Sequence, residues 1–173
     1  MPEHTDDVLK PGPHFDPGPF ALDLYRLLCI VLADKAVAKL SVDARGGGIA
    51  GLQARYRKVE TTRVLVSSAV ALRIMFDRYP KVFGKLPQRP CGMLYPKWPG
   101  RTSELLPLRE ACNKIVNATE SKDDLARNPN EEGSYVRPFL YLYGTREDDG
   151  WRAQLSIVEF VRGAASAFAR ASR

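Results

Sequence analysis

The segment VRPFLYLYGTREDDGWRAQLS at residues 136–156 shows that this chain contains β-structure. Within the predicted strand 136–143, aromatic residues alternate with leucines over residues 139–143, which is the two-residue period of a β-strand. A second alternating run covers residues 151–156, and the intervening DDG at 148–150 has the composition of a hairpin turn. We therefore predict an antiparallel β-hairpin over about residues 136–156.

The sequence on both sides of this hairpin has the spacing of helices. Residues 19–40 and 52–79 repeat apolar residues every three or four positions. A shorter helix fits residues 107–119, and Ser156 with Glu159 forms a capping box that opens a last helix. An isolated hairpin is marginal in water, so we expect it to cover one side of the helices. The predicted fold class is α+β, mainly α: a helical bundle with an antiparallel β-hairpin near the C-terminus.

The remaining segments are rich in proline, glycine and polar residues. Residues 1–18 are predicted to form a flexible arm before a single domain at residues 19–173, because prolines and a lack of apolar groups disfavour packing. Residues 80–102 are predicted to be an irregular loop with a short strand at 93–95. Residues 120–135 are polar and rich in turn residues, and are predicted to be a surface loop.

The chain carries more basic than acidic residues, and the excess is uneven. Lys and Arg number 26 against 20 Asp and Glu, which gives a formal net charge of +6. Residues 1–20 alone carry −3, so the rest of the chain carries +9. A basic body favours an acidic partner such as nucleic acid. The alternative is that the charge only keeps the protein soluble.

Histidine and cysteine restrict the chemistry of the predicted domain. His4 and His14 both lie in the N-terminal arm, so the rest of the chain has no histidine. The three cysteines, Cys29, Cys91 and Cys112, form no CxxC pair. We therefore predict no catalytic residue, no metal site, no cofactor and no disulfide framework.

We expect no association with a membrane. The longest apolar run, residues 27–33, is far shorter than the roughly 20 residues of a membrane-spanning helix. The N-terminus is acidic and polar, unlike the basic and then apolar start of a signal peptide. Together with the lack of a predicted disulfide framework, these features predict a soluble cytoplasmic protein.

Two groups of polar residues are candidates for binding an anion. Three residues of the predicted helix at 107–119 are spaced four apart and share one face, and the second long helix starts with a basic run. In an antiparallel bundle both groups can share a groove that binds phosphate. The alternative is a solvated helix face. The predicted anion- or nucleic-acid-binding residues are Arg55, Arg57, Lys58, Arg109, Asn113 and Asn117.

Aromatic and basic residues also occur together on the predicted hairpin and on the loop before it. Bases of single-stranded nucleic acid stack on aromatic rings while arginines bind phosphates, and Arg137, Arg146 and Arg152 lie in the hairpin. The alternative is that the rings fill the buried face of the hairpin. The predicted stacking residues are Trp98, Tyr141 and Trp151.

Residues 108–118, LREACNKIVNA, resemble the signature helix of the HEPN superfamily, which comprises all-helical nucleotide-binding and ribonuclease domains. In that motif an arginine and a polar residue are followed by three variable residues and a histidine. Asn113 matches the polar residue, whereas Cys112 stands at the arginine position and Asn117 at the histidine position. The resemblance therefore implies a degenerate member without metal-independent ribonuclease activity.

These patterns leave three functions open. The first is a non-catalytic basic binding or adaptor protein that acts on nucleic acid or a nucleoprotein complex, as in mobile-element or defence biology. The second is a structural or oligomeric protein–protein interaction domain, in which the nearly all-apolar first helix packs against another chain. The third, ranked below these two, is a nuclease whose metal is held by loop carboxylates.

Overall fold

The computed structural model describes residues 17–43, 48–127, 134–147 and 149–171. In this part of the chain two long helices come first, and short elements then lead into a sheet and a last helix. The arm predicted at residues 1–18 lies outside the described residues except for Pro17 and Gly18, which begin the first helix.

The helices of the described residues form one layer. The two long helices, α1 (Pro17–Asp43) and α2 (Gly48–Arg78), lie where the three- and four-residue spacing predicted them and pack against each other. The rest of the layer consists of α4 (Leu108–Asn117) and α5 (Ile157–Ala171), with the short α3 (Pro80–Phe83) and the 3₁₀ helix η1 (Leu86–Gln88) following α2. None of the described helices has the length and apolar character needed to cross a membrane.

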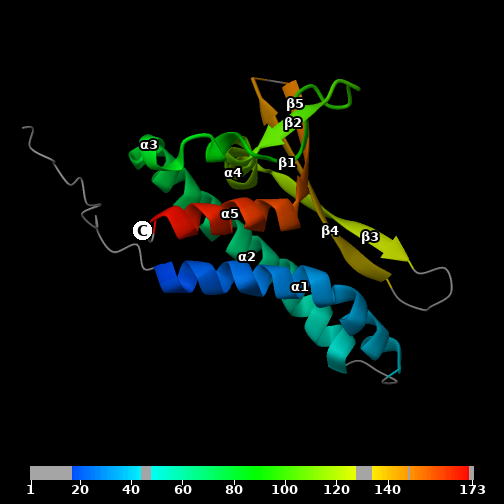
Figure 1. Cartoon of the computed structure of the whole chain (residues 1–173). Helices are drawn as coiled ribbons and strands as arrows, with labels where there is room; N and C mark the ends of the chain where they lie inside the picture. The colour runs from blue at the N-terminus through cyan, green and yellow to red at the C-terminus, as the bar shows by residue number, and fades with distance from the viewer. Residues whose placement is uncertain (1–16, 44–47, 128–133, 148, 172–173) are drawn as a thin grey trace, which may run out of the picture.

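Five antiparallel strands form a single sheet beside this layer (Figure 1). The strands are β1 (Pro90–Tyr95), β2 (Glu104–Pro107), β3 (Glu120–Arg127), β4 (Ser134–Arg146) and β5 (Asp149–Ser156). Their order across the sheet is β2-β1-β5-β4-β3. β4 and β5 pair in antiparallel fashion, with Tyr141 opposite Gln154, so both strands predicted within residues 136–156 are present. They are interior strands of a larger sheet and not a separate hairpin added to a bundle.

The polar surface loop predicted at residues 120–135 is wrong for residues 120–127. These residues form β3, which pairs with β4 from Glu120 opposite Tyr143 to Arg127 opposite Ser134. β3 lies at the edge of the sheet, where charged side chains limit pairing with further strands. Only one of its side chains is buried, so its sequence carries no alternation of apolar and polar residues.

The two faces of the sheet differ in burial. On β5, Trp151, Ala153 and Leu155 are buried against the helices, whereas Arg152 and Gln154 point to the other side. The helices pack on one side of the sheet only (Figure 1): α1, α4 and α5 contact strands, and α2 packs against α1 and α4. We call the other side the open face. It carries Met93, Tyr95, Lys122, Phe139, Tyr141, Tyr143, Arg152 and Gln154.

Candidate functional site

Arg57, one of the predicted anion-binding residues, is engaged in ion pairs within the chain. Its Nη1 lies 3.2 Å from Oδ2 of Asp34, and its Nη2 lies 3.3 Å from Oδ2 of Asp123. Asp34 is only 3% exposed, and it also accepts hydrogen bonds from Nε2 of Gln53 and from the backbone N–H of Val136, both at 2.7 Å. A buried carboxylate requires such partners. Through its two ion pairs, Arg57 links α2 to α1 and to β3.

The groove predicted between Arg57 and Arg109 does not form. α4 packs against α2, and Arg109 pairs with Asp77 near the C-terminus of α2. Arg57 and Asp77 are separated by about 30 Å along this helix. Asn113 donates a hydrogen bond at 3.0 Å to the carboxylate one turn before it in α4, and Asn117 is exposed at the end of that helix. The predicted anion-binding residues therefore do not converge: Arg55, Arg57 and Lys58 lie near the start of α2, Arg109 lies near its end, and Asn113 and Asn117 follow along α4.

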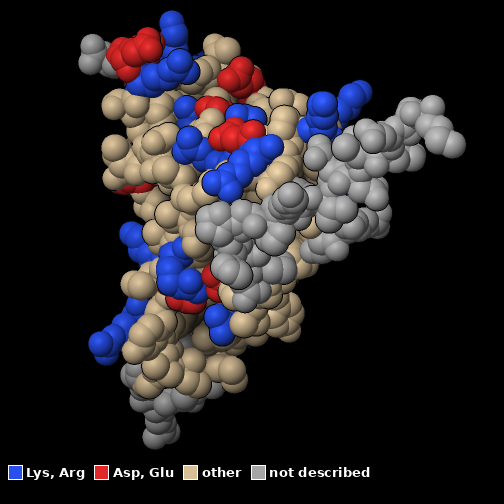
Figure 2. Space-filling model, turned by 90° about the vertical axis from the view of Figure 1, so that its left-hand side faces the viewer, with Lys and Arg blue, Asp and Glu red and all other residues tan. Residues whose placement is uncertain are grey.

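Basic side chains do not gather into one patch on the side of the molecule drawn in Figure 2. Among the residues coloured there, Lys and Arg lie beside Asp and Glu in groups separated by uncharged surface. Several of the arginines are paired, such as Arg89 with Glu159 at 3.5 Å. Arg55 and Lys58 are exposed near the start of α2, and the structure gives them no ion pair with a described residue.

Trp151 belongs to the core, so the prediction that it stacks on a ligand is wrong. Its side chain faces the helices, and the residue is 4% exposed. Nζ of Lys114 in α4 lies 4.3 Å from the centroid of its ring. On the neighbouring strand, a Cβ at Gly144 would come within 2.3 Å of Cζ2 of Trp151. The absence of a side chain at Gly144 thus provides the space in which the indole lies.

Arg152 and three aromatic rings form a cluster on the open face. The guanidinium carbon of Arg152 lies 3.8 Å from the ring centroid of Trp98, 4.2 Å from that of Tyr95 and 5.7 Å from that of Tyr141. The rings of Tyr95 and Trp98 meet edge to face, with centroids 6.1 Å apart. The backbone N–H of Trp98 donates a 2.7 Å hydrogen bond to the carbonyl of Gly150, which holds the β1–β2 loop against β5. We call these four side chains the Arg152 cluster.

No described residue provides Arg152 with an anionic partner. Within the described residues its guanidinium makes no ion pair or hydrogen bond, and its Nε is buried with no acceptor. An unsatisfied buried N–H costs about 1–3 kcal/mol, whereas a cation–π contact returns about 0.5–2 kcal/mol. The rings therefore hold the planar guanidinium in place, and its Nη groups have no acceptor among the described residues.

Further aromatic side chains extend the cluster across the open face. Nζ of Lys122 lies 5.1 Å from the ring centroid of Tyr143 and 3.2 Å from Oε1 of Glu120. Arg137 pairs with Asp124 at 3.7 Å. Carboxylates balance these two cations near the β3 edge, whereas no described carboxylate pairs with Arg152. Three half-buried rings lie two residues apart along β4: Phe139, Tyr141 and Tyr143.

Nothing in the geometry of the described cysteines and carboxylates assembles a reaction centre. Burial raises the pKa of the Cys91 and Cys112 thiols to about 12, so both are protonated at neutral pH. A groove of about 220 Å³ lies between α2, α4 and β3, and Glu120 is the one carboxylate that lines it. Among the described residues, no group of three or more His, Cys, Asp and Glu side chains is placed to hold a metal ion.

One member of the Arg152 cluster, Tyr95, was not among the predicted site residues. Trp98 and Tyr141 were predicted to stack, and Arg152 was one of the hairpin arginines named beside them. The alternation over residues 151–156 already places Arg152 on the face opposite Trp151. Tyr95 comes opposite Arg152 only through the pairing of β1 with β5, a long-range contact that has no local signal in the sequence.

Comparison of the chain with family models, with curated proteins and with solved structures found no significant match. The resemblance of residues 108–118 to the HEPN signature helix therefore stays a prediction. In the structure these residues form α4 and the residue after it, and α4 packs against α2.

Proposed function

We propose that this protein is a non-catalytic binding protein for single-stranded nucleic acid, and that the open face of the sheet is its binding surface. The observation that carries the proposal is the Arg152 cluster. It combines a guanidinium that has no anionic partner among the described residues with aromatic rings on a sheet face that no described helix covers. The body of the chain is also basic, which favours association with a polyanion.

Single-stranded nucleic acid contains a binding partner for both features of this surface, the guanidinium and the aromatic rings. A phosphate can accept charge-assisted hydrogen bonds from Arg152, and unpaired bases can lie on the rings beside it. Tyr141 and Tyr143 are separated by about 7 Å along β4, which leaves room for a separate base on each ring. Stacking on an aromatic side chain contributes about 1–3 kcal/mol per base. Bases in a duplex are already stacked on each other, so the surface favours a single strand.

The test is the binding of fluorescently labelled oligo-dT and oligo-U, followed by anisotropy at several salt concentrations. Arg152→Ala should weaken binding about tenfold or more, the effect of losing a charge-assisted contact. It should also reduce the slope of log K against log salt by about 0.7, the value for one phosphate contact on a single strand. Tyr143→Ala should weaken binding without changing that slope, because a stacking contact releases no counterion.

Arg162→Ala is the matched control for charge. Arg162 lies on α5, on the helical side of the molecule, and is paired with Glu159. The substitution Arg162→Ala removes the same charge from the chain as Arg152→Ala, but at a paired site away from the open face. We therefore expect less than about a threefold change in nucleic-acid binding. Equal losses in Arg152→Ala and Arg162→Ala would mean that only net charge matters, and unchanged binding in Arg152→Ala would refute the proposed surface.

A protein–protein interaction domain is the second candidate function. It is favoured by a separate observation, the exposed apolar side chains on the outer sides of α1 and α2, such as Tyr25, Leu32 and Val59. A role in mobile-element or defence biology, and a cytoplasmic location, stay predictions.

A further inference from the structure

The outer side of α1, which faces away from the core, is apolar. Leu22, Tyr25 and Leu32 are 47%, 65% and 60% exposed, and Cys29 and Ala36 are exposed on the same side. The opposite side of α1 is buried in the core of the chain. A helix that is apolar on both sides is buried on both sides in its functional state. We call these five exposed residues the α1 stripe.

The spacing of the α1 stripe is that of a seam between two helices. Intervals of three and four residues alternate from Leu22 to Ala36, which extends the stripe over about 21 Å of helix. This strict alternation places the side chains in line, so that they can insert between those of a partner helix. The buried side of an ordinary amphipathic helix has a wider apolar stripe. The occupant that fits is therefore another helix.

We propose that α1 pairs with α1 of a second copy of this chain along the α1 stripe, which gives a two-fold symmetric homodimer. The stripe meets the requirement of a two-fold interface, because a stripe with this spacing is complementary to a second copy of itself. The proposal goes beyond nucleic-acid binding by the open face and does not depend on it.

The charges beside the stripe are compatible with a second copy. Between Leu22 and Ala36, Arg26 and Lys35 are the charged residues at the positions that flank the seam. Arg26 pairs with Asp23 at 3.5 Å, and Lys35 lies over the ring of Tyr135 at 5.3 Å, so both cations already have partners in their own chain. In a parallel pair, and in an antiparallel pair that places Cys29 opposite Leu32, each cation faces an apolar residue of the copy. These residues are Ala21 or Ala33 for Arg26, and Leu28 or Leu40 for Lys35.

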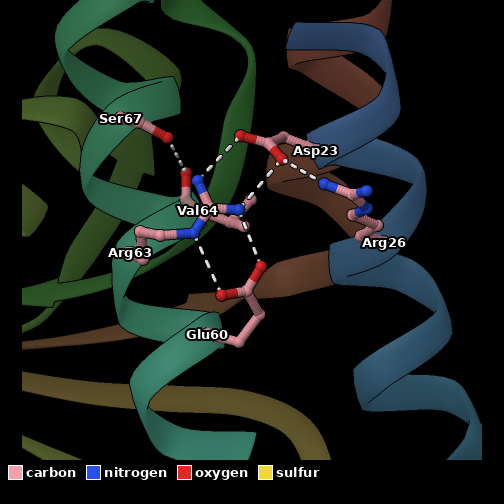
Figure 3. A network of polar contacts seen from close by, with 6 residues as sticks. All are labelled: Asp23, Arg26, Glu60, Arg63, Val64 and Ser67. Carbon is pink, nitrogen blue, oxygen red and sulfur yellow. Dashed lines mark hydrogen bonds and ion pairs between the residues drawn. The ribbon is translucent and has the colours of Figure 1, made fainter. Parts of the chain in front are cut away.

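The adjacent outer side of α2 can also be covered without leaving a charge unpaired. Val59 and Val66 are exposed there, with Arg63 between them. Figure 3 shows Arg63 held between carboxylates of both helices, with its Nη2 3.0 Å from Asp23 and 2.7 Å from Glu60. Since these carboxylates neutralise the guanidinium, a second chain would not bury an isolated cation. Exposed apolar surface on two neighbouring helices marks an interaction site.

Cys29 offers a direct readout of this dimer. It is the middle residue of the α1 stripe, so two-fold pairing brings the two Cys29 thiols close together, whereas Cys91 and Cys112 are buried. A short bismaleimide should link two full-length chains through Cys29. Cys29→Ser should abolish the link but retain the dimer in sedimentation velocity.

Leu32→Glu should convert the dimer to a monomer, with a dimer dissociation constant at least about tenfold higher, because it places a charge within the apolar seam. The matched control is Leu105→Glu on β2, which changes a residue of similar exposure, 63%, away from α1 and should leave the dimer intact. Far-UV circular dichroism checks that both variants keep the fold.

A full-length chain that stays monomeric at all concentrations overturns the proposal, even if its α1 stripe binds another protein. A dimer that persists in Leu32→Glu, or that is cross-linked equally well in Cys29→Ser, overturns it as well.

Discussion

Asp34 shows how a single side chain joins three parts of the chain. Its carboxylate is buried on α1 and is bound by the side chains of Gln53 and Arg57 from α2 and by the backbone of Val136 from β4. A charge in such a place is stable only because each oxygen has donors. The same bonds explain why Arg57, which looks like a free surface cation in the sequence, is fixed in the structure.

Asp34→Ala should lower the free energy of unfolding by about 3 kcal/mol, since it leaves Arg57 and the N–H of Val136 without their buried acceptor. Urea unfolding of the two proteins measures the difference. The control is Glu120→Ala, which removes a carboxylate from an exposed pair with Lys122 and should cost less than about 1 kcal/mol. A loss of similar size in both variants would contradict the structural role of Asp34.

At the scale of a single element, residues next to the start of α5 determine where this helix begins. The backbone N–H of Glu159 donates a 3.3 Å hydrogen bond to Oγ of Ser156, which is one half of the predicted capping box. Ser156→Ala should therefore lower the free energy of unfolding by about 1 kcal/mol. In the control Ser166→Ala, the lost bond is to the carbonyl of Arg162 within the same helix, and little or no loss is expected. Thermal unfolding of both variants checks the difference.

Elements with a strong local pattern could be predicted from the sequence, and elements that depend on distant partners could not. The long helices and the strands β4 and β5 follow from apolar periodicity and lie close to their predicted positions. β3 and β2 are edge strands at the two ends of the sheet, and pairing with a neighbour creates them. The same reason explains which site residues could be predicted. The position of Tyr141 follows from the alternation within its own strand, whereas Tyr95 is brought to the cluster by the pairing of β1 with β5.

At the scale of the whole molecule, the open face and the α1 stripe are separate surfaces: the open face is the side of the sheet away from the helices (Figure 1), and the stripe is on the side of α1 away from the core. A dimer formed through α1 would therefore present two open faces that do not block each other. Oligonucleotides long enough to reach both faces should bind more tightly than short ones, because the second contact is intramolecular.

Leu32→Glu should leave the affinity for a short oligonucleotide unchanged and weaken the binding of a long one about tenfold or more. Anisotropy with labelled strands of two lengths measures both effects. Equal weakening for both lengths would mean that the α1 stripe itself contacts the nucleic acid, and no weakening for either would mean that the two open faces do not act together.

The position of the two tryptophans has an optical consequence. Trp151 lies in the apolar core, whereas Trp98 is 37% exposed and rests on the guanidinium of Arg152. Nucleobases quench indole emission when they stack on it, so occupation of the Arg152 cluster would dim Trp98 and leave the bluer emission of Trp151 unaffected. The chain thus carries its own fluorescent reporter, and the wavelength at which emission is lost would tell a ligand at the cluster from a change in the core.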